Sequence, residues 1–550
     1  MKIKKDMPPF WRMAVPCIKI ITYILVLSIC FALCSCRLNN SKDDDPEGLI
    51  VGTDSQTTIN LAIDSLDTLN PIFTKSKSVS DCMQLVFEPL FTFDEAFNPI
   101  NVLAQSLTPS SDFKSYTLKI YEGILWHDGT PLTANDVRHT INLIRFNDSR
   151  YTSMLKYITN VTVADNLTLV ITLSRPVCNF SALLSFPIVK SNTSADNLSD
   201  YIPIGTGAFK YTSKSGAGQI CLSANENYSG EQPYISEIYL NVLKDTSAVV
   251  NAFNASEIDA VTSTLIDLKK NTPRGEIYTN DYTSNNLVFL GINCYSGVFS
   301  GANTRKALSY IIDKQDIVTN EMFSRAVAAS LPLNPDAWYT PKIPPVSYDA
   351  DYINEVLSLD GWILNDDNIY ERTKTDGDEV KTEKLRADII LNEDNEERYR
   401  IAVRIADYLN NSGIETSVTI LSFEDYYERI QTEKYSLFLG ETELPKNMDL
   451  YSLLCTDDNY FAYYSQNMRN AVYKTGVGTS ADEEMAAFVE FANVFNDEMP
   501  FIPLFFRKES VIYEKSMSGT SMPTVFTAYT NPEHWYISKM NKTASSKPSD

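Results

Sequence analysis

The sequence predicts an α/β protein with more than one hydrophobic core, and three observations support this. Residues 116–144 contain an alternating strand, an Asp128-Gly129 turn and an amphipathic helix. Residues 385–420 contain a strand, a helix and a second strand in that order. The chain has 550 residues, and even without an N-terminal leader it is long enough for two or three cores.

The stretch from 116 to 144 is the most regular part of the sequence. Thr133-Ala-Asn-Asp136 has the spacing of a capping box, in which the Thr hydroxyl and the Asp carboxylate satisfy the first amides of a helix. Apolar residues alternate along the strand and then recur at helical spacing: Tyr116, Leu118 and Ile120, followed by Val137, Ile141 and Ile144. These patterns predict a strand, a tight turn and a capped helix.

The second unit begins with an alternating strand at 385–391. A helix with one apolar face follows at 396–409, Gly413 is its C-cap, and a strand at 418–420 completes the unit. Such a βαβ unit requires a right-handed crossover and a parallel strand pair. The charged run before it, 371–384, is predicted to be an exposed hairpin or loop. Further elements are expected as strands at 58–64, 161–164, 167–173 and 287–294, and as helices at 76–90 and 304–317.

The N-terminus has the pattern of a signal peptide. Lys2, Lys4, Lys5 and Arg12 precede an apolar run at 20–33, which is short for a membrane span. Leu33-Cys-Ser-Cys36 resembles a bacterial lipobox with Cys36 as the acylated first residue of the mature protein, and a polar tether extends to residue 56. The alternative is an uncleaved anchor helix. Both interpretations place the bulk of the chain outside the membrane.

Charge and metal-ligand content exclude several function classes. The net charge of −23 is unsuited to binding nucleic acid, whose phosphates need a basic surface. We expect no metal and no cofactor, because no cysteine or histidine pair has metal-ligand spacing. Five cysteines follow Cys36, and free thiols are the default, with one disulfide possible: Cys82, Cys178, Cys221, Cys294 and Cys455.

One stretch closely resembles the signature sequence of the family 5 extracellular solute-binding proteins, the peptide and nickel receptors of ABC importers. This stretch is Trp126-His-Asp-Gly-Thr-Pro-Leu-Thr-Ala-Asn-Asp-Val137. Further stretches resemble other motifs of that family in the same order, so the resemblance covers roughly Leu61 to Tyr513. These stretches are Leu69-Asn-Pro71, Phe87-Glu-Pro-Leu90, the Gly-Thr-Gly run at 203–210, 257–260, 304–317 and 499–507. For the Gly-Thr-Gly run we expect tight turn packing, because no Lys-Ser/Thr pair follows it.

The resemblance implies a periplasmic-binding-protein-like two-lobe fold (type II, cluster C) with an extra small α+β domain. The implied organisation is a signal peptide at 1–35, a lipidated tether at 36–56, a discontinuous lobe I at 57–87, 173–285 and 500–540, an accessory domain at 88–172, lobe II at 286–499, and a disordered tail at 541–550. The apolar strand at 287–294 would then carry the chain into lobe II.

By the same resemblance, the loop before the first long helix offers main-chain groups to the ligand, and the candidates are Lys77, Ser78 and Val79. Peptide receptors of the family carry a buried Asp for the α-amino group in the stretch that corresponds to 435–449. Here Leu444 stands at that place, and Glu441 replaces a usual Trp. Either an acid nearby substitutes, since a desolvated ammonium needs an opposing charge, or the ligand has no free amine. The acids that could substitute are Glu441, Glu443 and Asp449, and Asn447 is a further candidate for ligand binding.

The implied function is a lipoprotein, on the outer face of the bacterial cytoplasmic membrane, that captures peptides and delivers them to an ABC permease. No Walker A motif occurs, so ATP hydrolysis would belong to a partner chain. One alternative is the same fold binding a nickel chelate, an opine or an oligosaccharide, or acting as a sensor. Another is a secreted hydrolase using His127 with Asp128, although adjacent residues there point apart.

Overall fold

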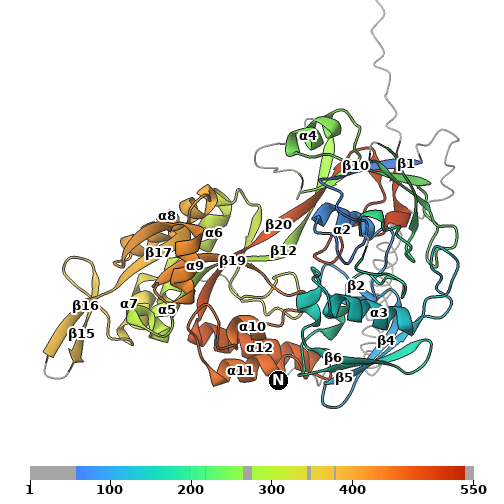
Figure 1. Ribbon diagram of the computed structural model, residues 1–550. Helices are drawn as coiled ribbons and strands as arrows, with labels where there is room; N and C mark the ends of the chain where they lie inside the picture. Colours follow the sequence, from blue (N-terminus) through green and yellow to red (C-terminus); the bar gives the residue numbers. More distant parts are fainter. Residues whose placement is uncertain are drawn as a thin grey trace, which may run out of the picture. The chain divides into compact units, whose positions relative to one another are not determined.

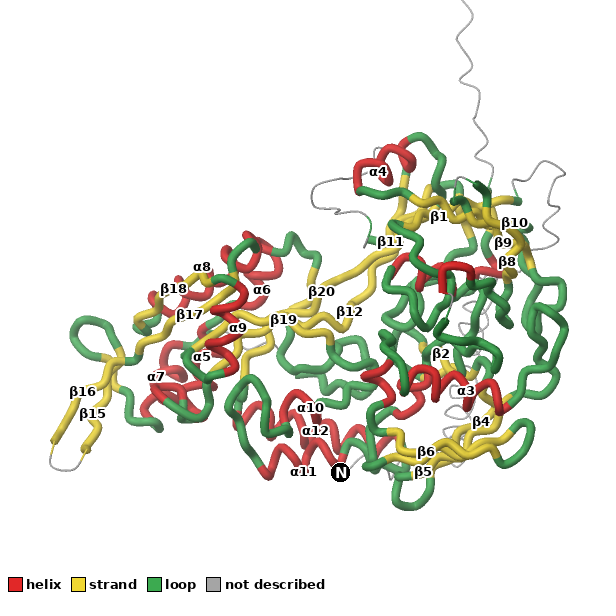
Figure 2. The backbone as a smooth tube through the Cα atoms, in the orientation of Figure 1, coloured by secondary structure: helices red, strands yellow, loops and turns green. Residues whose placement is uncertain are grey.

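The structure is a computed structural model that describes residues 57–538, except 197, 217, 264, 266–275, 344–347 and 377–378. The signal peptide, Cys36, the tether and the tail at 541–550 lie outside the described residues. Figure 2 shows both helices and strands in the described part. Among the described helices, none combines the length and the apolar character that a membrane crossing needs.

Within the described residues, one eleven-stranded mixed sheet organises the fold. Its order is β18 (Glu415–Leu421), β17 (Arg386–Asn392), β19 (Leu437–Glu443), β12 (Ile277–Ile292), β20 (Phe501–Glu514), β11 (Ala260–Thr262), β1 (Thr58–Ile63), β10 (Glu237–Val242), β9 (Ile220–Ala224) and β8 (Phe209–Lys214), with β13 (Ala326–Ala328) paired to β20.

Two long strands, β12 and β20, belong to both halves of this sheet. β12 pairs with β19 through Asn286–Ile292 and with β20 along most of its length, and β20 reaches β11 through Val511–Tyr513. Figure 1 shows the two strands side by side between the β17–β19 group and the strands β1 and β10. The fold is therefore the expected two-lobe α/β architecture, joined by one outgoing and one returning strand. The strand expected at 287–294 is longer than predicted and starts at Ile277.

The β12–β20 ladder is interrupted at one place. The register shifts between Thr283 and Leu287, so residues 284–286 do not pair with β20. Asn334 replaces the missing partner, because its Nδ2 donates to the Thr283 and Ser284 carbonyls at 3.3 Å and to Asn285 Oδ1 at 2.9 Å. A bulge bends and twists a strand locally, and here it lies where the two lobes are joined.

A separate four-stranded sheet confirms the strand–turn–helix prediction. Its order is β4 (Ala104–Pro109), β5 (Ser115–Ile120), β7 (Thr168–Leu173) and β6 (Ile158–Val163). Helix α3 (Ala134–Arg145) packs against β6 and β7 with Val137, Ile141 and Ile144 fully buried. The Asp136 carboxylate accepts the Thr133 amide at 2.9 Å, as a capping box requires.

The predicted βαβ unit is also confirmed. Helix α8 (Glu396–Asn411) connects the parallel strands β17 and β18, and Gly413 after it has φ +87°. The charged run at 371–384 is an antiparallel hairpin, β15 (Tyr370–Asp376) with β16 (Glu379–Lys384). The other helices are α4 (Thr246–Asn254), α5 (Ala302–Ile311), α6 (Lys314–Asp316), α7 (Ala350–Ser358), α9 (Phe423–Gln431), α10 (Tyr451–Leu454), α11 (Gln466–Lys474) and α12 (Ala481–Glu498), and the short strands are β2 (Phe91–Phe93), β3 (Pro99–Asn101), β14 (Ile363–Leu364), β21 (Met517–Ser518) and β22 (Tyr536–Ile537).

The helix predicted at 76–90 is wrong in length: α2 spans only Lys77–Met83. The carbonyls of Leu85 and Val86 accept the amides of Phe209 and Gly207 at 3.0 and 2.9 Å, which requires that the chain leave the helix. A Cβ on Gly205 would lie 1.8 Å from the Val86 carbonyl oxygen. The Gly-Thr-Gly run therefore serves close packing, as its sequence suggested.

The cysteines that follow Cys36 are free thiols. All five cysteines of the described residues lack a disulfide partner, and Cys82, Cys178 and Cys455 are buried. The default expectation of unpaired thiols is confirmed.

Candidate ligand-binding site

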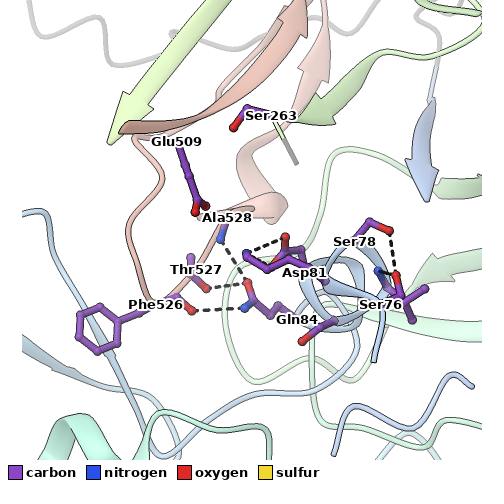
Figure 3. Close-up of polar contacts among 12 residues, drawn as sticks. Ser76, Ser78, Asp81, Gln84, Ser263, Glu509, Phe526, Thr527 and Ala528 are labelled. Atoms are coloured by element: carbon purple, nitrogen blue, oxygen red, sulfur yellow. Dashed lines mark hydrogen bonds and ion pairs between the residues drawn. The ribbon is translucent and has the colours of Figure 1, made fainter. Parts of the chain in front are cut away.

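The N-terminus of α2 is fixed by a compact hydrogen-bond network. Ser76 Oγ accepts the Val79 amide at 3.2 Å, and the Ser76 and Ser78 hydroxyls donate to Asp64 Oδ1 at 2.6 and 2.7 Å. Ser78 and Val79 are buried and Lys77 is exposed, and Figure 3 shows Ser76 and Ser78 together at the start of the helix. The three predicted residues are thus held rigidly by the end of β1, and their contact with a ligand stays a prediction.

Lys77 and Asp81 form an ion pair one turn apart on α2. Nζ lies 3.0 Å from each carboxylate oxygen, and the Asp81 side chain is 5% exposed. Burial works against the charge of Lys77, but Asp81 and Glu509 outweigh it and raise its pKa. Figure 3 shows Glu509 extending from β20 toward the side of α2 that carries Asp81. Glu509 also accepts the Tyr282 hydroxyl at 2.6 Å, so β12, β20 and α2 contribute to one charged cluster.

The two acids of β19 have different surroundings. Glu441 accepts from Arg507 at 2.6 Å and from Arg398 at 3.3 Å. Burial would raise its pKa, but the two arginines lower it below the usual value. Glu443 is exposed at the end of the strand and makes no ion pair with any described residue. Of these two predicted acids, only Glu443 keeps its charge uncompensated.

Asn447 and Asp449 contact the segment that follows β7. Asn447 Nδ2 donates to the Cys178 carbonyl at 2.9 Å, and the Asp449 carboxylate forms an ion pair with Arg175. The Arg175 guanidinium also stacks on Tyr157 and Tyr451, at 4.0 and 4.3 Å from the ring centroids. The polar groups of Asn447 and Asp449 are therefore occupied within the chain. The assignment of these two residues to a ligand stays a prediction.

Two adjoining cavities lie next to this cluster. One has a volume of about 320 Å³ and is lined by residues that include Gln84, Tyr151, Lys446 and Phe526. The other has about 380 Å³ and is lined by residues of β12 that include Asp281 and Tyr282. The two share Glu95, Met522 and Thr524 in their walls. Gln84 holds a wall of the first cavity in place, since its side-chain amide bonds to Phe526, Thr527 and Ala528 (Figure 3).

The chemistry of the cluster suits a dipolar ligand. Cations and anions of this region interact electrostatically with one another: Lys77, Arg150 and Lys446 with Asp81, Glu443 and Glu509. Among the described residues, no group of three His, Cys, Asp or Glu side chains is placed to hold a metal ion. A ligand with an ammonium and a carboxylate would find partners of both signs.

His127 and Asp128 are engaged separately. His127 Nδ1 accepts the Gly205 amide at 3.2 Å and Nε2 lies 3.0 Å from the Gly207 carbonyl oxygen. Asp128 forms an ion pair with Lys190. With both ring nitrogens on the backbone, His127 supports the fold around the Gly-Thr-Gly run and does not form the acid–base dyad of the hydrolase alternative.

Sequence reasoning missed five residues of the cluster, namely Asp81, Arg150, Tyr282, Lys446 and Glu509. Asp81 could have been found, because it follows Lys77 by four residues on a helix and carries the opposite charge. Tyr282 and Glu509 come together through the β12–β20 register, in which they are direct partners. No local pattern reveals that register, since the two residues are far apart in sequence.

Comparison with known proteins agrees with the geometry. Oligopeptide-binding protein AppA of Bacillus subtilis (strain 168) is 22% identical over 561 residues, covering 94% of this chain and 98% of the relative. Its solved structure in complex with a nonapeptide has a TM-score of 0.58 at 21% identity, covering 88% of this chain and 99% of that one. The MppA periplasmic murein tripeptide binding protein, in its unliganded open form, has a TM-score of 0.75 at 18% identity, covering 89% and 98%.

NikZ from Campylobacter jejuni, solved with Ni(L-His), has a TM-score of 0.62 at 22% identity, covering 88% of this chain and 99% of that chain. These likenesses confirm the two-lobe α/β fold. The family model "Bacterial extracellular solute-binding proteins, family 5 Middle" matches residues 98–458, more than half of the chain. The protein therefore belongs to family 5 of the bacterial extracellular solute-binding proteins.

Proposed function

We propose that the protein captures peptides between its two lobes and delivers them unaltered to the permease of an ABC importer. The observation that carries this proposal is the convergence of opposite charges beside the two cavities. Lys77 with Asp81 comes from α2, Glu509 from β20, and Lys446 from the loop after β19. A short peptide carries an ammonium and a carboxylate at its ends and is matched by such a site. AppA, which is named an oligopeptide-binding protein and is solved with a nonapeptide, supports the same conclusion.

Glu443 is the acid that we assign to the ligand's amino group in place of the missing Asp. Glu441 is neutralised by Arg507 and Arg398, and Asp449 by Arg175, so neither offers spare negative charge. Glu443 has no such partner among the described residues and shares the electrostatic environment of Lys446 and Tyr282. Main-chain groups around Lys77 to Val79 would bind the peptide backbone, which gives affinity without side-chain preference.

Closure of the lobes would proceed by bending at the β12–β20 bulge. Hinge motions are absorbed by a few residues at the junction of two rigid bodies. Residues 284–286 do not pair with β20 there, while Asn334 donates to the Ser284 carbonyl and to the Asn285 side chain. A ligand that contacts α2 on one side and the loop after β19 on the other would stabilise the closed arrangement.

Attachment and energy supply complete the proposal. Acylation of Cys36 would hold the protein on the outer face of the cytoplasmic membrane, where stable attachment takes more than one acyl chain. ATP hydrolysis would belong to ATPase subunits on other chains, and the protein itself would carry out no catalysis.

The proposal is tested by thermal-shift screening and calorimetry of the purified protein without its leader. The probes are a pool of di- to nonapeptides, nickel–histidine, an opine and an oligosaccharide, and bound peptide is recovered for mass spectrometry. We expect stabilisation by peptides alone, with the peptide recovered intact. Stabilisation by nickel–histidine, the opine or the sugar but by no peptide would overturn the peptide assignment, and cleavage of the peptide would overturn the transport role.

A further inference from the structure

A third cavity, of about 680 Å³, takes no part in the proposed function. Its walls come from the β4–β5 hairpin, the segment after β7, the loop after β13 and the turn between α11 and α12. It shares Phe93 with the cavity of about 320 Å³ and Phe97 with the cavity of about 380 Å³. Lys77, Glu443 and Glu509 of the charged cluster do not line it. The cavity is therefore separate from the site assigned to the peptide.

Aromatic side chains form much of the wall of this cavity. They come from separate segments of the chain: Phe93, Phe97, Phe113, Tyr116, Phe180 and Trp338. The rings of Tyr116 and Phe180 lie 4.3 Å apart between centroids, so the hairpin and the segment after β7 form one continuous surface. The face of an aromatic ring attracts a cation that lies within about 6 Å of its centroid. Such a wall favours a cationic ligand.

Two of the phenylalanines have an unusual backbone conformation. Phe97 and Phe113 have φ of +65° and +55°, in the left-handed region that bulky residues avoid, and Asn179 in the same lining has φ of +44°. The turn that carries Phe113 is held by Asp112, whose carboxylate accepts the Ser110 hydroxyl at 2.6 Å. Strained conformations of this kind persist only where the surroundings impose them, and they cluster at ligand sites.

Glu484 is the only charged side chain among the described residues that line the cavity. It is partly buried in the first turn of α12, and its carboxylate makes no hydrogen bond or ion pair with any described residue. Burial raises the pKa of this carboxyl group. Asp482 and Glu483 add two more negative charges to the same turn, which outweigh the roughly half positive charge at the start of a helix. Glu484 therefore lacks a counter-ion.

The composition of the wall favours one class of cation. A primary ammonium group has three N–H donors, and each of them needs an acceptor when the group leaves water. A quaternary ammonium ion has no N–H group, and aromatic faces together with one carboxylate are sufficient to hold it. The volume of about 680 Å³ lies within the range of small-molecule sites, roughly 300–1,000 Å³.

We propose that this cavity is a second ligand site, which binds a small quaternary ammonium compound with its charge between the aromatic wall and the Glu484 carboxylate. The site is additional to the peptide site of the proposed function. Its walls belong to the four-stranded sheet on one side and to the α11–α12 turn on the other, so a bound cation contacts both.

The test is calorimetry of the purified protein without its leader, with three probes of similar length. These are choline, ethanolamine, and 3,3-dimethylbutan-1-ol, in which a carbon atom replaces the charged nitrogen of choline. We expect the wild type to bind choline about tenfold more tightly than either of the other two. Glu484→Gln should lower the affinity for choline about tenfold and leave the affinity for the neutral alcohol unchanged. Phe113→Leu, which removes an aromatic face and keeps an apolar side chain, should also weaken choline binding.

Asp482→Asn is the matched control. Asp482 is exposed in the same turn of α12 and does not line the cavity, so this variant removes an equal charge and should keep the wild-type affinity for choline. Glu443→Gln is the control for the peptide site and should keep it as well. Thermal unfolding without ligand shows that each variant is folded.

Three outcomes would contradict the inference. The first is equal affinity of the wild type for choline and the neutral alcohol, or unchanged choline affinity in Glu484→Gln. The second is a loss of choline binding in Glu443→Gln but not in Glu484→Gln, which would place the cation at the peptide site. The third is ethanolamine binding as tightly as choline, which would overturn the assignment to quaternary ammonium compounds. The peptide screen measures the proposed function independently of all three.

Discussion

Asn447 and Cys178 are joined by hydrogen bonds in both directions. Asn447 Nδ2 donates to the Cys178 carbonyl at 2.9 Å, and Cys178 Sγ donates to the Asn447 carbonyl at 3.1 Å. Beside them, Arg175 pairs with Asp449. These bonds join the loop after β19 to the segment after β7. Lys446 is the neighbour of Asn447 in that loop. The arrangement gives the candidate site a fixed wall on its β19 side.

Removing the Asp449 charge should destabilise the protein. Asp449→Asn leaves Arg175, a largely buried guanidinium, without its counter-ion, and we expect a loss of about 3–5 kcal/mol in the free energy of unfolding. Urea denaturation measures it. Glu490→Gln, which breaks the exposed Lys474–Glu490 pair, is the control and should cost less than about 1 kcal/mol. Lost peptide binding with unchanged stability would instead place Asp449 at the ligand.

Glu441 should stabilise the fold in a pH-dependent manner. Although burial would raise the pKa of Glu441, Arg507 and Arg398 lower it in the folded state below its ordinary value of 4.5. The stabilisation is therefore complete above about pH 4.5 and is lost as the pH falls through the folded pKa. Glu441→Gln should lose about 1–3 kcal/mol at pH 7.

The measurement is urea denaturation of both proteins between pH 3 and 7. The difference between wild type and Glu441→Gln should shrink toward the acid end. A difference that is constant over the whole range would contradict the role of the charge.

Lys446 should destabilise the fold at neutral pH, whereas Glu441 stabilises it. Burial lowers its pKa in the fold, so the unfolded chain binds the proton more tightly, and wild-type stability rises between about pH 8 and 10.5. Below this window Lys446→Met should be more stable than the wild type, by up to about 3 kcal/mol at roughly 1.4 kcal/mol per pKa unit. Thermal unfolding at pH 7 and at pH 10.5 measures the difference, which should vanish at the higher pH. A variant less stable than wild type at pH 7 would show that Lys446 serves the fold.

Asn334 should control the stiffness of the junction between the lobes. It is fully buried, and Asn334→Ala leaves the polar groups of residues 283–285 without its three hydrogen bonds. We expect a loss of about 1–3 kcal/mol and faster amide hydrogen exchange at the bulge. The exposed Asn320→Ala is the control and should change stability by less than about 0.5 kcal/mol. Unchanged amide hydrogen exchange at 283–287 in Asn334→Ala would show that the bulge does not take part in the hinge motion.

Local patterns in the sequence were sufficient for the elements whose causes are local. The capping box depends on Thr133 and Asp136, which are three residues apart, and the βαβ unit on the periodicity of consecutive segments, and both formed as predicted. The helix at 76–90 was overestimated because its end depends on Gly205 and Gly207, which contact it from a distant segment.

The sequence by itself determined the family, the α/β class and the order of the elements, because these follow from hydrophobic periodicity, helix caps and sequence motifs along the chain. Only the tertiary structure decided which acidic side chains have a counter-ion and which do not. Arg507 neutralises Glu441 and Arg175 neutralises Asp449 across long separations, while Glu443 and Lys446 are left without counter-ions among the described residues. The energy of a charged side chain depends on what lies within a few ångströms of it in space, and strand pairing and loop packing set those neighbours.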